Sequence, residues 1–402
     1  MADSQGLPHG QFYRAYSKWA KGGWGMIFTG NVFVDPAYLG NTLEVSIPSI
    51  IDTKARTALK KWCQSCSSEG TPTLMQLNHP GRQSILCAGK RSVFAKTLAP
   101  SAVPLNLGSG IIPKTARVVL FGTPREMSSV DIETVISQFA TAARVAAEAG
   151  FAGVELHAAH GYLLSQFLSK KTNLRQDAWG GDATKRARIV VEIINGIRKV
   201  VPKGFAVGVK VNSVDHQDDK EMGDSLIQLK SIVDVGVDFI EVSGGSWEDP
   251  KACVMMQPNM PPPSARTHAR EAFFLSFAKA IREHFSDVPL IVTGGFRSRV
   301  GMASAVQEGD CDLIGLARPA VLNPELPKNK IFNAEVHEAE KLYTENLEKP
   351  LLERLIGNRV AGAGAESANA TTLSMPHKRQ ADRQGYLEED PKKKVQTPKK
   401  KT

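Results

Sequence analysis

Cysteine and long apolar runs are both scarce in this sequence. Its 402 residues include five cysteines, which are too few and too scattered for a disulfide framework. No uninterrupted apolar run approaches the roughly 20 residues needed to cross a bilayer. The N-terminal segment MADSQGLPHGQ also lacks the basic and apolar parts of a signal peptide. We therefore expect a cytoplasmic protein with no membrane contact.

One pair of cysteines, Cys63 and Cys66, has the C-x-x-C spacing of redox motifs. The surrounding segment ALKKWCQSCSSEG predicts a helix that precedes the apolar strand Thr73–Leu77. A structural role is therefore favoured over a redox role, which stays open as the weaker alternative.

Positive charge is concentrated at the C-terminal end. The net charge is +9, and residues 375–402 alone hold nine Lys or Arg against four Asp or Glu. A run such as PKKKVQTPKKKT is more often solvated than bound, so we expect residues 361–402 to form a disordered basic tail. Nucleic-acid binding and a nuclear location are the weaker alternatives. Residues 331–360 precede the tail and have the periodicity of a C-terminal helical segment.

Residues 1–330 alternate between apolar strands and amphipathic helices. This alternation predicts parallel strands wrapped into a (β/α)8 TIM barrel. A Rossmann domain is disfavoured because no G-x-G-x-x-G opens a first helix. The connection over residues 80–127 is too long for an ordinary loop, so we expect a lid over the site. The seven expected strands are residues 25–34, 73–77, 152–156, 205–211, 238–243, 289–293 and 312–316.

The strongest candidate for chemistry is the segment GFAGVELHAAHGYLLSQFLS, residues 150–169. It places His157, His160 and Tyr162 directly after a buried strand, at the edge of a parallel sheet where ligands bind. The two imidazoles can donate hydrogen bonds to one oxygen atom, and the phenol can deliver a proton nearby. A carbonyl substrate suits this arrangement. Zinc binding by the H-x-x-H pair is weaker, because no third ligand accompanies it, and we expect no metal site.

The same segment, followed by TNLRQDAWGG and RARIVVEIINGIR, resembles the old yellow enzyme family of FMN-dependent ene-reductases. The likeness extends over roughly residues 10 to 325. It includes GGWGMIFTGNVFVD, LMQLNHPGR, VGVKVNSVD, FIEVSGG, LIVTGG and DLIGLARPAVLNP, in the order of that family. The resemblance implies that the first barrel strand, which family members place before the helix at Gln11, is missing or substituted here. It also implies FMN as cofactor and NAD(P)H as reductant.

The resemblance and the residue chemistry together predict a flavin site. Gln76 is expected to hydrogen-bond the pyrimidine edge, and Lys210 to supply a positive charge that stabilises the reduced flavin. Lysine stands where the family usually has arginine, which keeps the charge but loses the paired donors. For the phosphate, barrels of this kind use the loops after the last two strands. The remaining expected cofactor contacts are Gly30, Ser243, Gly294, Gly295, Ala317 and Arg318.

Four polar residues beyond the candidate site match a polar motif of the family: Asn173, Arg175, Asp177 and Arg186. We expect them to brace the loop that carries Tyr162 rather than to take part in chemistry.

These predictions combine into an FMN-dependent oxidoreductase that uses NAD(P)H to reduce the C=C bond of an enone or enal. His157 and His160 would hold the carbonyl oxygen, and Tyr162 would protonate the α-carbon. One alternative is a Schiff-base lyase or aldolase with Lys210 as nucleophile. Another is a truncated, catalytically impaired barrel that only binds a partner, since a lost strand exposes two strand edges. Association into a homo-oligomer is left open.

Overall fold

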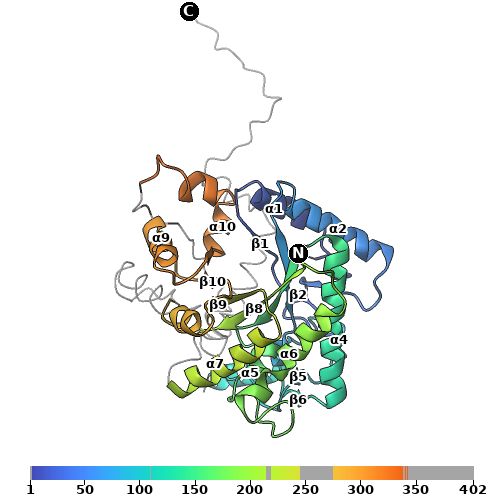
Figure 1. Ribbon diagram of the computed structural model, residues 1–402. Coiled ribbons are helices and arrows are strands. Elements are labelled where there is room, and N and C mark those ends of the chain that lie inside the picture. Colours follow the sequence, from blue (N-terminus) through green and yellow to red (C-terminus); the bar gives the residue numbers. More distant parts are fainter. Residues whose placement is uncertain are drawn as a thin grey trace, which may run out of the picture.

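A parallel sheet forms the centre of the molecule (Figure 1). The computed structural model describes residues 2–108, 110–213, 219–244, 275–337, 340 and 342. The strand order is β11-β10-β9-β8-β7-β4-β2-β3, and β1 also pairs with β4. The strands are β1 (Ile27–Phe28), β2 (Val32–Phe33), β3 (Val45–Ser46), β4 (Thr73–Asn78), β7 (Gly153–Ala158), β8 (Ala206–Asn212), β9 (Phe239–Ser243), β10 (Leu290–Thr293) and β11 (Leu313–Gly315).

All seven strands expected from the sequence are confirmed. The first of them, predicted as one strand over residues 25–34, is divided into β1 and β2, and β3 is an addition beside β2. Successive strands lie parallel and are joined through helices on the outside of the sheet, which is the connectivity of a (β/α)8 barrel. The carboxyl ends of all these strands therefore share one edge, where the candidate site lies.

Helices α1, α2, α4, α6 and α7 follow one another around the outer face of the sheet, each in contact with the next. Local signals explain where they begin: Asp52 caps α2, and Ser128 with Asp131 forms a capping box on α4. No helix among the described residues is long and apolar enough to span a membrane. The helices are α1 (Gly10–Ala20), α2 (Thr53–Cys66), α4 (Ser129–Ala149), α5 (Leu163–Leu168), α6 (Ala183–Arg198), α7 (Asp219–Asp234), α9 (Arg299–Gln307) and α10 (Arg318–Leu322), and residues 275–284 are also helical.

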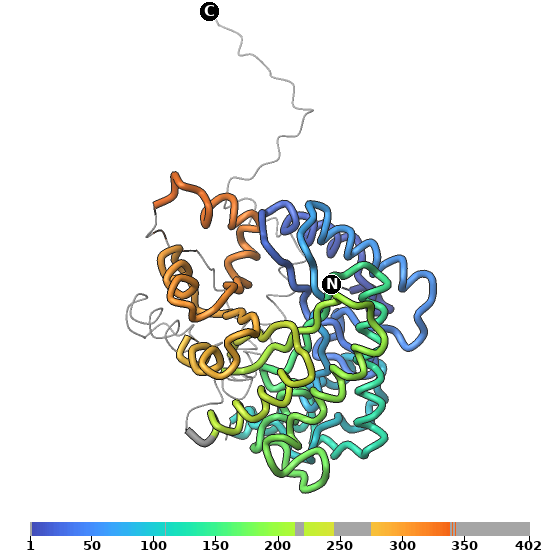
Figure 2. Tube along the Cα trace, in the orientation of Figure 1, coloured from blue at the N-terminus to red at the C-terminus, as the bar shows by residue number. Residues whose placement is uncertain are grey.

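Side chains, rather than strand pairing, join the two ends of the sheet. Within the described residues, β1 and β11 do not pair with each other. The indole of Trp19 in α1 donates to the carbonyl of Ala320 in α10, and Trp24 donates to that of Pro324, both at 2.8 Å. The dark blue N-terminal and orange C-terminal segments accordingly lie side by side (Figure 2). A missing or substituted first strand stays a prediction.

The interior of the barrel is apolar near the amino ends of the strands and charged near their carboxyl ends. Leu74, Phe239 and Ile291 form a buried cluster with Phe28 packed against it. Gly208 makes room for this cluster, because a Cβ there would lie 2.0 Å from the ring of Phe239. Towards the carboxyl ends, the strands bear polar and charged side chains instead. A filled floor below a polar layer is typical of barrels that bind ligands at this edge.

The long connection over residues 80–127 folds into a small unit of its own. It contains η1 (Gly81–Gln83), α3 (Ile111–Leu120), and a two-stranded parallel sheet of β5 (Leu98–Ala99) and β6 (Arg125–Glu126). Its first turn reaches the site, since Gln83 Nε2 donates to the carbonyl of His160 at 3.0 Å. Its proposed role as a lid stays a prediction.

The first described residues of the predicted C-terminal helical segment are not an α-helix. A π-helical turn, η2 (Pro327–Ile331), ends just at its predicted start, and residues 332–337 form turns and bends. The prediction of helix over residues 331–360 is thus wrong for these positions. Its remainder, apart from residues 340 and 342, and the basic tail over residues 361–402 lie outside the described residues.

Candidate active site

His157, His160 and Tyr162 come together at the end of β7. The ring centroids of the two histidines are 4.9 Å apart, and those of His157 and Tyr162 are 4.8 Å apart, with the rings edge to face in both pairs. His160 has a φ of +58° and Gly161 one of +75°. A left-handed histidine is uncommon and costs about 1–3 kcal/mol, and such strain is concentrated at functional sites. This turn places the His160 ring beside that of His157.

Both histidines are neutral at physiological pH. Burial, assisted by His160 and Lys210, lowers the pKa of His157 well below its ordinary value. Burial and Lys210 lower the pKa of His160 to about 3. The backbone N–H of Ala159 donates to Nδ1 of His157 at 3.3 Å, so the proton of this imidazole lies on Nε2. His157 is therefore a neutral hydrogen-bond donor.

Two further polar groups contact His157, His160 and Tyr162, which are called the triad below. Nε2 of His160 lies 3.1 Å from the hydroxyl of Ser243, at the end of β9. Asn31, between β1 and β2, donates to the hydroxyl of Tyr162 at 3.3 Å. The sequence analysis missed Asn31, whose partner lies 131 residues away in the chain. A donor aimed at the Tyr162 oxygen stabilises the phenolate and so eases release of its proton.

A charged layer lies beside the histidines on β4, β7, β8 and β9. Strand register places His157, Lys210 and Glu241 in one row. The ammonium of Lys210 forms an ion pair with Glu241 at 2.5 Å, and the amide of Gln76 donates to Glu155 at 2.5 Å. All four polar members of the layer are at most 9% exposed. The expected cofactor residues Gln76 and Lys210 thus lie close to the triad, each with a carboxyl partner that the sequence analysis did not identify.

The polar groups of this edge fit a flavin. Asn78 is fully buried at the end of β4, and neither its side-chain nitrogen nor its oxygen has a partner within the described parts of the chain. In the neighbouring His79, Nδ1 accepts a hydrogen bond from the N–H of Gly81, and the buried Nε2 has no partner among the residues described. Buried polar atoms without partners are costly, and a heterocycle rich in donors and acceptors would satisfy them. Gln76 and Lys210 would hold its pyrimidine edge.

Gly30 is constrained differently from the other expected cofactor contacts. Its N–H donates to the hydroxyl of Tyr16 at 2.8 Å, and its carbonyl accepts from Thr29 at 2.8 Å. The residue itself is exposed. Because these bonds occupy its N–H and one lone pair of its carbonyl, any contact with a flavin would be mainly by van der Waals packing.

The expected phosphate end lies on the neighbouring strands β10 and β11. Gly294 and Gly295, directly after β10, have φ values of +129° and +82°, which other residues adopt only with strain. Ala317 stands where the family commonly has glycine, and its φ of −110° shows that alanine is tolerated. Arg318 opens α10 directly after Ala317, and its guanidinium has the paired donors that suit a phosphate.

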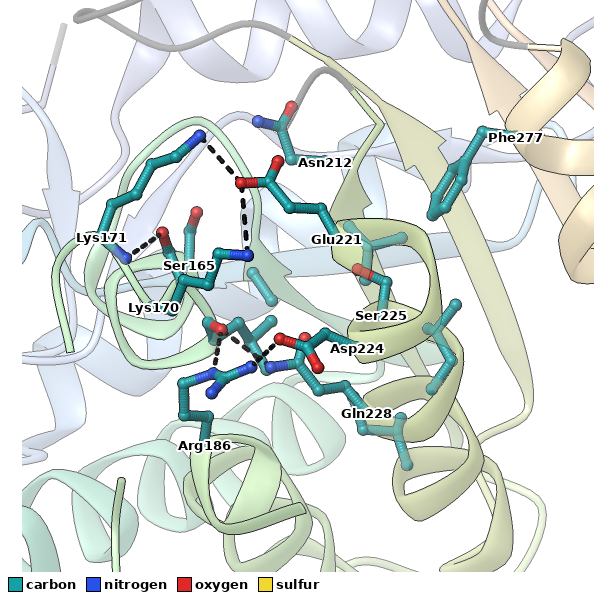
Figure 3. A pocket seen from close by; sticks show the side chains of 16 residues that line it. Ser165, Lys170, Lys171, Arg186, Asn212, Glu221, Asp224, Ser225, Gln228 and Phe277 are labelled. Carbon is teal, nitrogen blue, oxygen red and sulfur yellow. Dashed lines mark hydrogen bonds and ion pairs between the residues drawn. The ribbon is translucent and has the colours of Figure 1, made fainter. Parts of the chain in front are cut away.

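A hollow lies on the outer side of β7 and β8, on the face opposite to the candidate active site (Figure 3). It has a volume of about 70 Å³, and its wall includes Ala158 and Val211, which follow His157 and Lys210 and so point to the opposite face. Three basic side chains around it lie beside two acids. Lys170 and Lys171 point at Glu221, at 3.8 and 3.2 Å, and Arg186 pairs with Asp224 at 2.7 Å.

The cysteine pair has the properties of core residues. Cys63 and Cys66 are buried in α2, and burial raises the pKa of both thiols above the ordinary value. Redox chemistry needs the thiolate, which this environment disfavours. In the part of the chain that the structure describes, no group of three or more His, Cys, Asp or Glu side chains is placed to hold a metal ion.

Comparison with known proteins identifies the family. Residues 2–333 match the model of the NADH:flavin oxidoreductase / NADH oxidase family. The chain is 52% identical over 371 residues to the NADH-dependent flavin oxidoreductase iliE of Neonectria sp. (strain DH2), which covers 89% of this chain and 48% of that protein. It is 45% identical over 353 residues to iliE of Hypocrea jecorina (strain QM6a), and the aligned part covers 87% of this chain and 88% of that protein. The chain therefore spans about half the length of the first relative and most of the second.

Solved structures confirm the fold class. The old yellow enzyme homologue from Zymomonas mobilis superimposes with a TM-score of 0.65 at 21% identity, covering 84% of this chain and 87% of that one. Morphinone reductase superimposes with a TM-score of 0.64 at 21% identity, covering 81% of this chain and 82% of that one. At this identity the likeness concerns the fold alone. Together with the family match, it confirms the expected family, the (β/α)8 barrel, and FMN and NAD(P)H as cofactor and reductant.

Proposed function

Because the chain belongs to the NADH:flavin oxidoreductase / NADH oxidase family, we propose that it reduces the carbon–carbon double bond of α,β-unsaturated carbonyl compounds. The observation that supports this most directly is the meeting of two neutral imidazoles and a phenol at the end of β7, with centroids 4.8 to 4.9 Å apart. Such a set can polarise a carbonyl oxygen and supply one proton.

The histidines act on the carbonyl oxygen. Bound FMN supplies the hydride-transfer chemistry that links the nicotinamide to the substrate. His157 donates from Nε2 to the substrate oxygen, and His160 adds a second donor when its Nε2–H exchanges Ser243 for that oxygen. These bonds strengthen as negative charge builds up on the oxygen, so they favour the transition state over bound substrate. Loss of one such donor typically lowers the rate by about 10²–10³-fold.

Tyr162 supplies the proton that completes the reduction. As hydride reaches the β-carbon, the α-carbon becomes basic, and the phenol of Tyr162 can protonate it. Asn31 stabilises the phenolate that remains, through its hydrogen bond of 3.3 Å. The reducing nucleotide is proposed to be NADH, because both relatives described above are named NADH-dependent.

Lys210 is poorly suited to the alternative Schiff-base chemistry. Burial alone would lower the pKa of its ammonium, but its surroundings, Glu241 above all, outweigh burial and raise the pKa above its ordinary value. A lysine nucleophile must be uncharged when it attacks. The ion pair with Glu241 at 2.5 Å favours the opposite state. We therefore assign Lys210 an electrostatic role beside the flavin.

The role of Tyr162 is tested by Tyr162→Phe in the FMN-loaded protein. Stopped-flow traces should show flavin reduction by NADH within about twofold of wild type, and reoxidation by an enone slowed by roughly 10²-fold or more, as expected for loss of an acid catalyst. Tyr13→Phe is the control, because Tyr13 bonds Pro8 and Ala58 away from the site. Equal slowing of both half-reactions in Tyr162→Phe would argue against a proton-donor role.

A further inference from the structure

Two buried carboxyl groups share one cation beside the triad. Glu155 on β7 is fully buried, and Glu241 on β9 is 3% exposed. Lys210, on the strand between them, donates to Oε1 of Glu241 at 2.5 Å. Gln76 on β4 donates to Oε2 of Glu155, while Oε1 of Glu155 is buried and accepts no hydrogen bond from any residue that the structure describes. One ammonium thus faces two acids, and only one of the acids is paired with it.

Among the described residues, the remaining neighbours do not balance a second negative charge. Around the pair, β7 contributes His157, with His160 just beyond its end, and both are neutral. The adjacent β4 contributes the uncharged Gln76, and β10 contributes the hydroxyl of Thr293, which hydrogen-bonds Glu241. Each uncompensated buried charge costs several kcal/mol even after relaxation. A second carboxylate in this layer would therefore be strongly disfavoured.

We propose that Glu155 is a carboxylic acid in the folded protein, with its proton on Oε1 hydrogen-bonded to Glu241, and that it acts as a positioning residue for Gln76 and Lys210. This assignment accounts for the oxygen that receives no donor, because that oxygen is itself the donor. A hydrogen bond between the two carboxyl groups requires a proton between them, and the interaction with the other group raises the pKa of Glu155 and lowers that of Glu241. Burial and the nearby Glu241 raise the pKa of Glu155 well above its ordinary value, in agreement.

The proton on Glu155 matters for the flavin, a consequence that rests on the proposed function. With Glu155 neutral, Lys210 and Glu241 cancel, and the layer carries no net charge. With Glu155 ionised, the layer would carry one negative charge beside a cofactor whose reduced form is itself anionic, and would oppose reduction. Glu155 also accepts a hydrogen bond from the amide nitrogen of Gln76. This bond fixes the orientation of the Gln76 amide and therefore which of its atoms faces the cofactor.

The proton is measured directly by infrared difference spectroscopy of the FMN-bound protein near pH 7.5. Wild type should show a protonated-carboxyl band that shifts on labelling of glutamate with ¹³C, which requires no variant. Glu155→Gln should abolish the band, and Glu148→Gln should not, since Glu148 is a carboxylate paired with Arg56 and Arg144 on the surface. No such band in labelled wild type, or its survival in Glu155→Gln, would overturn the proposal.

The midpoint potential of bound FMN gives a second, independent readout. Glu155→Gln removes no charge if Glu155 is already neutral. The affinity of the protein for reduced FMN, divided by its affinity for oxidised FMN, should therefore change less than about threefold. The double variant Glu155→Gln/Glu241→Gln leaves Lys210 uncompensated and should raise that ratio at least tenfold, which for a two-electron couple is about 30 mV. A tenfold rise in Glu155→Gln alone would show that Glu155 is ionised. None of these results depends on enone turnover or on Tyr162.

Discussion

Arg175 is predicted to hold together the carboxyl ends of β5 and β6 in the connection over residues 80–127, and its replacement by methionine tests this. Its guanidinium is 6% exposed and donates to the carbonyls of Pro100, at 3.1 Å, and Met127, at 2.7 Å. It also forms a paired contact with Asp177, whose side chain is 46% exposed. Methionine keeps most of the length of the side chain but removes every donor. The family-based expectation was a brace for the loop of Tyr162, and these bonds reach the connection instead.

The magnitude follows from what each partner loses. The carbonyls of Pro100 and Met127 belong to buried residues, and a buried group left without its partner costs about 1–3 kcal/mol. The exposed ion pair with Asp177 contributes roughly 0–1 kcal/mol, because solvent screens it. Arg175→Met should therefore lower the free energy of unfolding by about 2–6 kcal/mol, out of a typical total of 5–15 kcal/mol.

Urea denaturation and limited proteolysis measure this effect. Arg175→Met should unfold at lower urea concentration, and new cleavage should appear within residues 80–127 before the barrel is cut. Asp177→Asn is the matched control, since it removes the exposed half of the same contact and should cost less than about 1 kcal/mol. Equal and small losses in the two variants would refute the reasoning, because the carbonyl contacts would then contribute nothing.

Two further predictions concern His79 and Arg318. Burial lowers the pKa of His79 to about 4, so as pH falls from about 6.5 towards 4 the unfolded chain takes up a proton that the folded protein does not, and stability should fall by up to about 3 kcal/mol. Melting temperatures measured from pH 7.5 to 4.5 should show a shallower loss in His79→Asn, and an unchanged slope would contradict this. Arg318→Met should weaken FMN binding at least tenfold in fluorescence titrations, since a charge-assisted bond to phosphate contributes about 1.5–3 kcal/mol. Arg14→Met, on the exposed face of α1, is the control and should bind FMN as wild type does.

Secondary structure was largely predictable because its signals are local. The apolar runs that became β4, β7, β8, β9, β10 and β11 each end within about two residues of the prediction. The turn signals were equally local, as in Gly150, which ends α4 with a φ of +97°. The predicted helix after residue 331 was wrong for residues 332–337. Periodicity alone predicts a helix only weakly where no apolar face is packed on a partner.

The charged layer beside the triad could not be predicted from the sequence. Glu155 and Glu241 both appear in the sequence as isolated acids within buried strands, 86 residues apart. The alternation of side chains along a strand shows that each glutamate points to the same face as the residues two positions away. It does not show which residue of another strand lies opposite the glutamate. Only the order and register of β7, β8 and β9 bring the two acids together around Lys210, with Glu241 level with the lysine and Glu155 two residues before its β7 partner His157.

The sequence by itself determined the triad, because His157, His160 and Tyr162 lie within six residues at one strand end, where chain connectivity alone holds them near one another. It also determined the parallel strand order, since short helical crossovers leave few other arrangements. Only the tertiary structure decided the protonation states. The pKa of a buried group depends on desolvation and on charges contributed by distant strands, as at His160, Lys210 and Glu155. The electrostatics of this site are thus a property of strand register, which brings together residues that the chain keeps far apart.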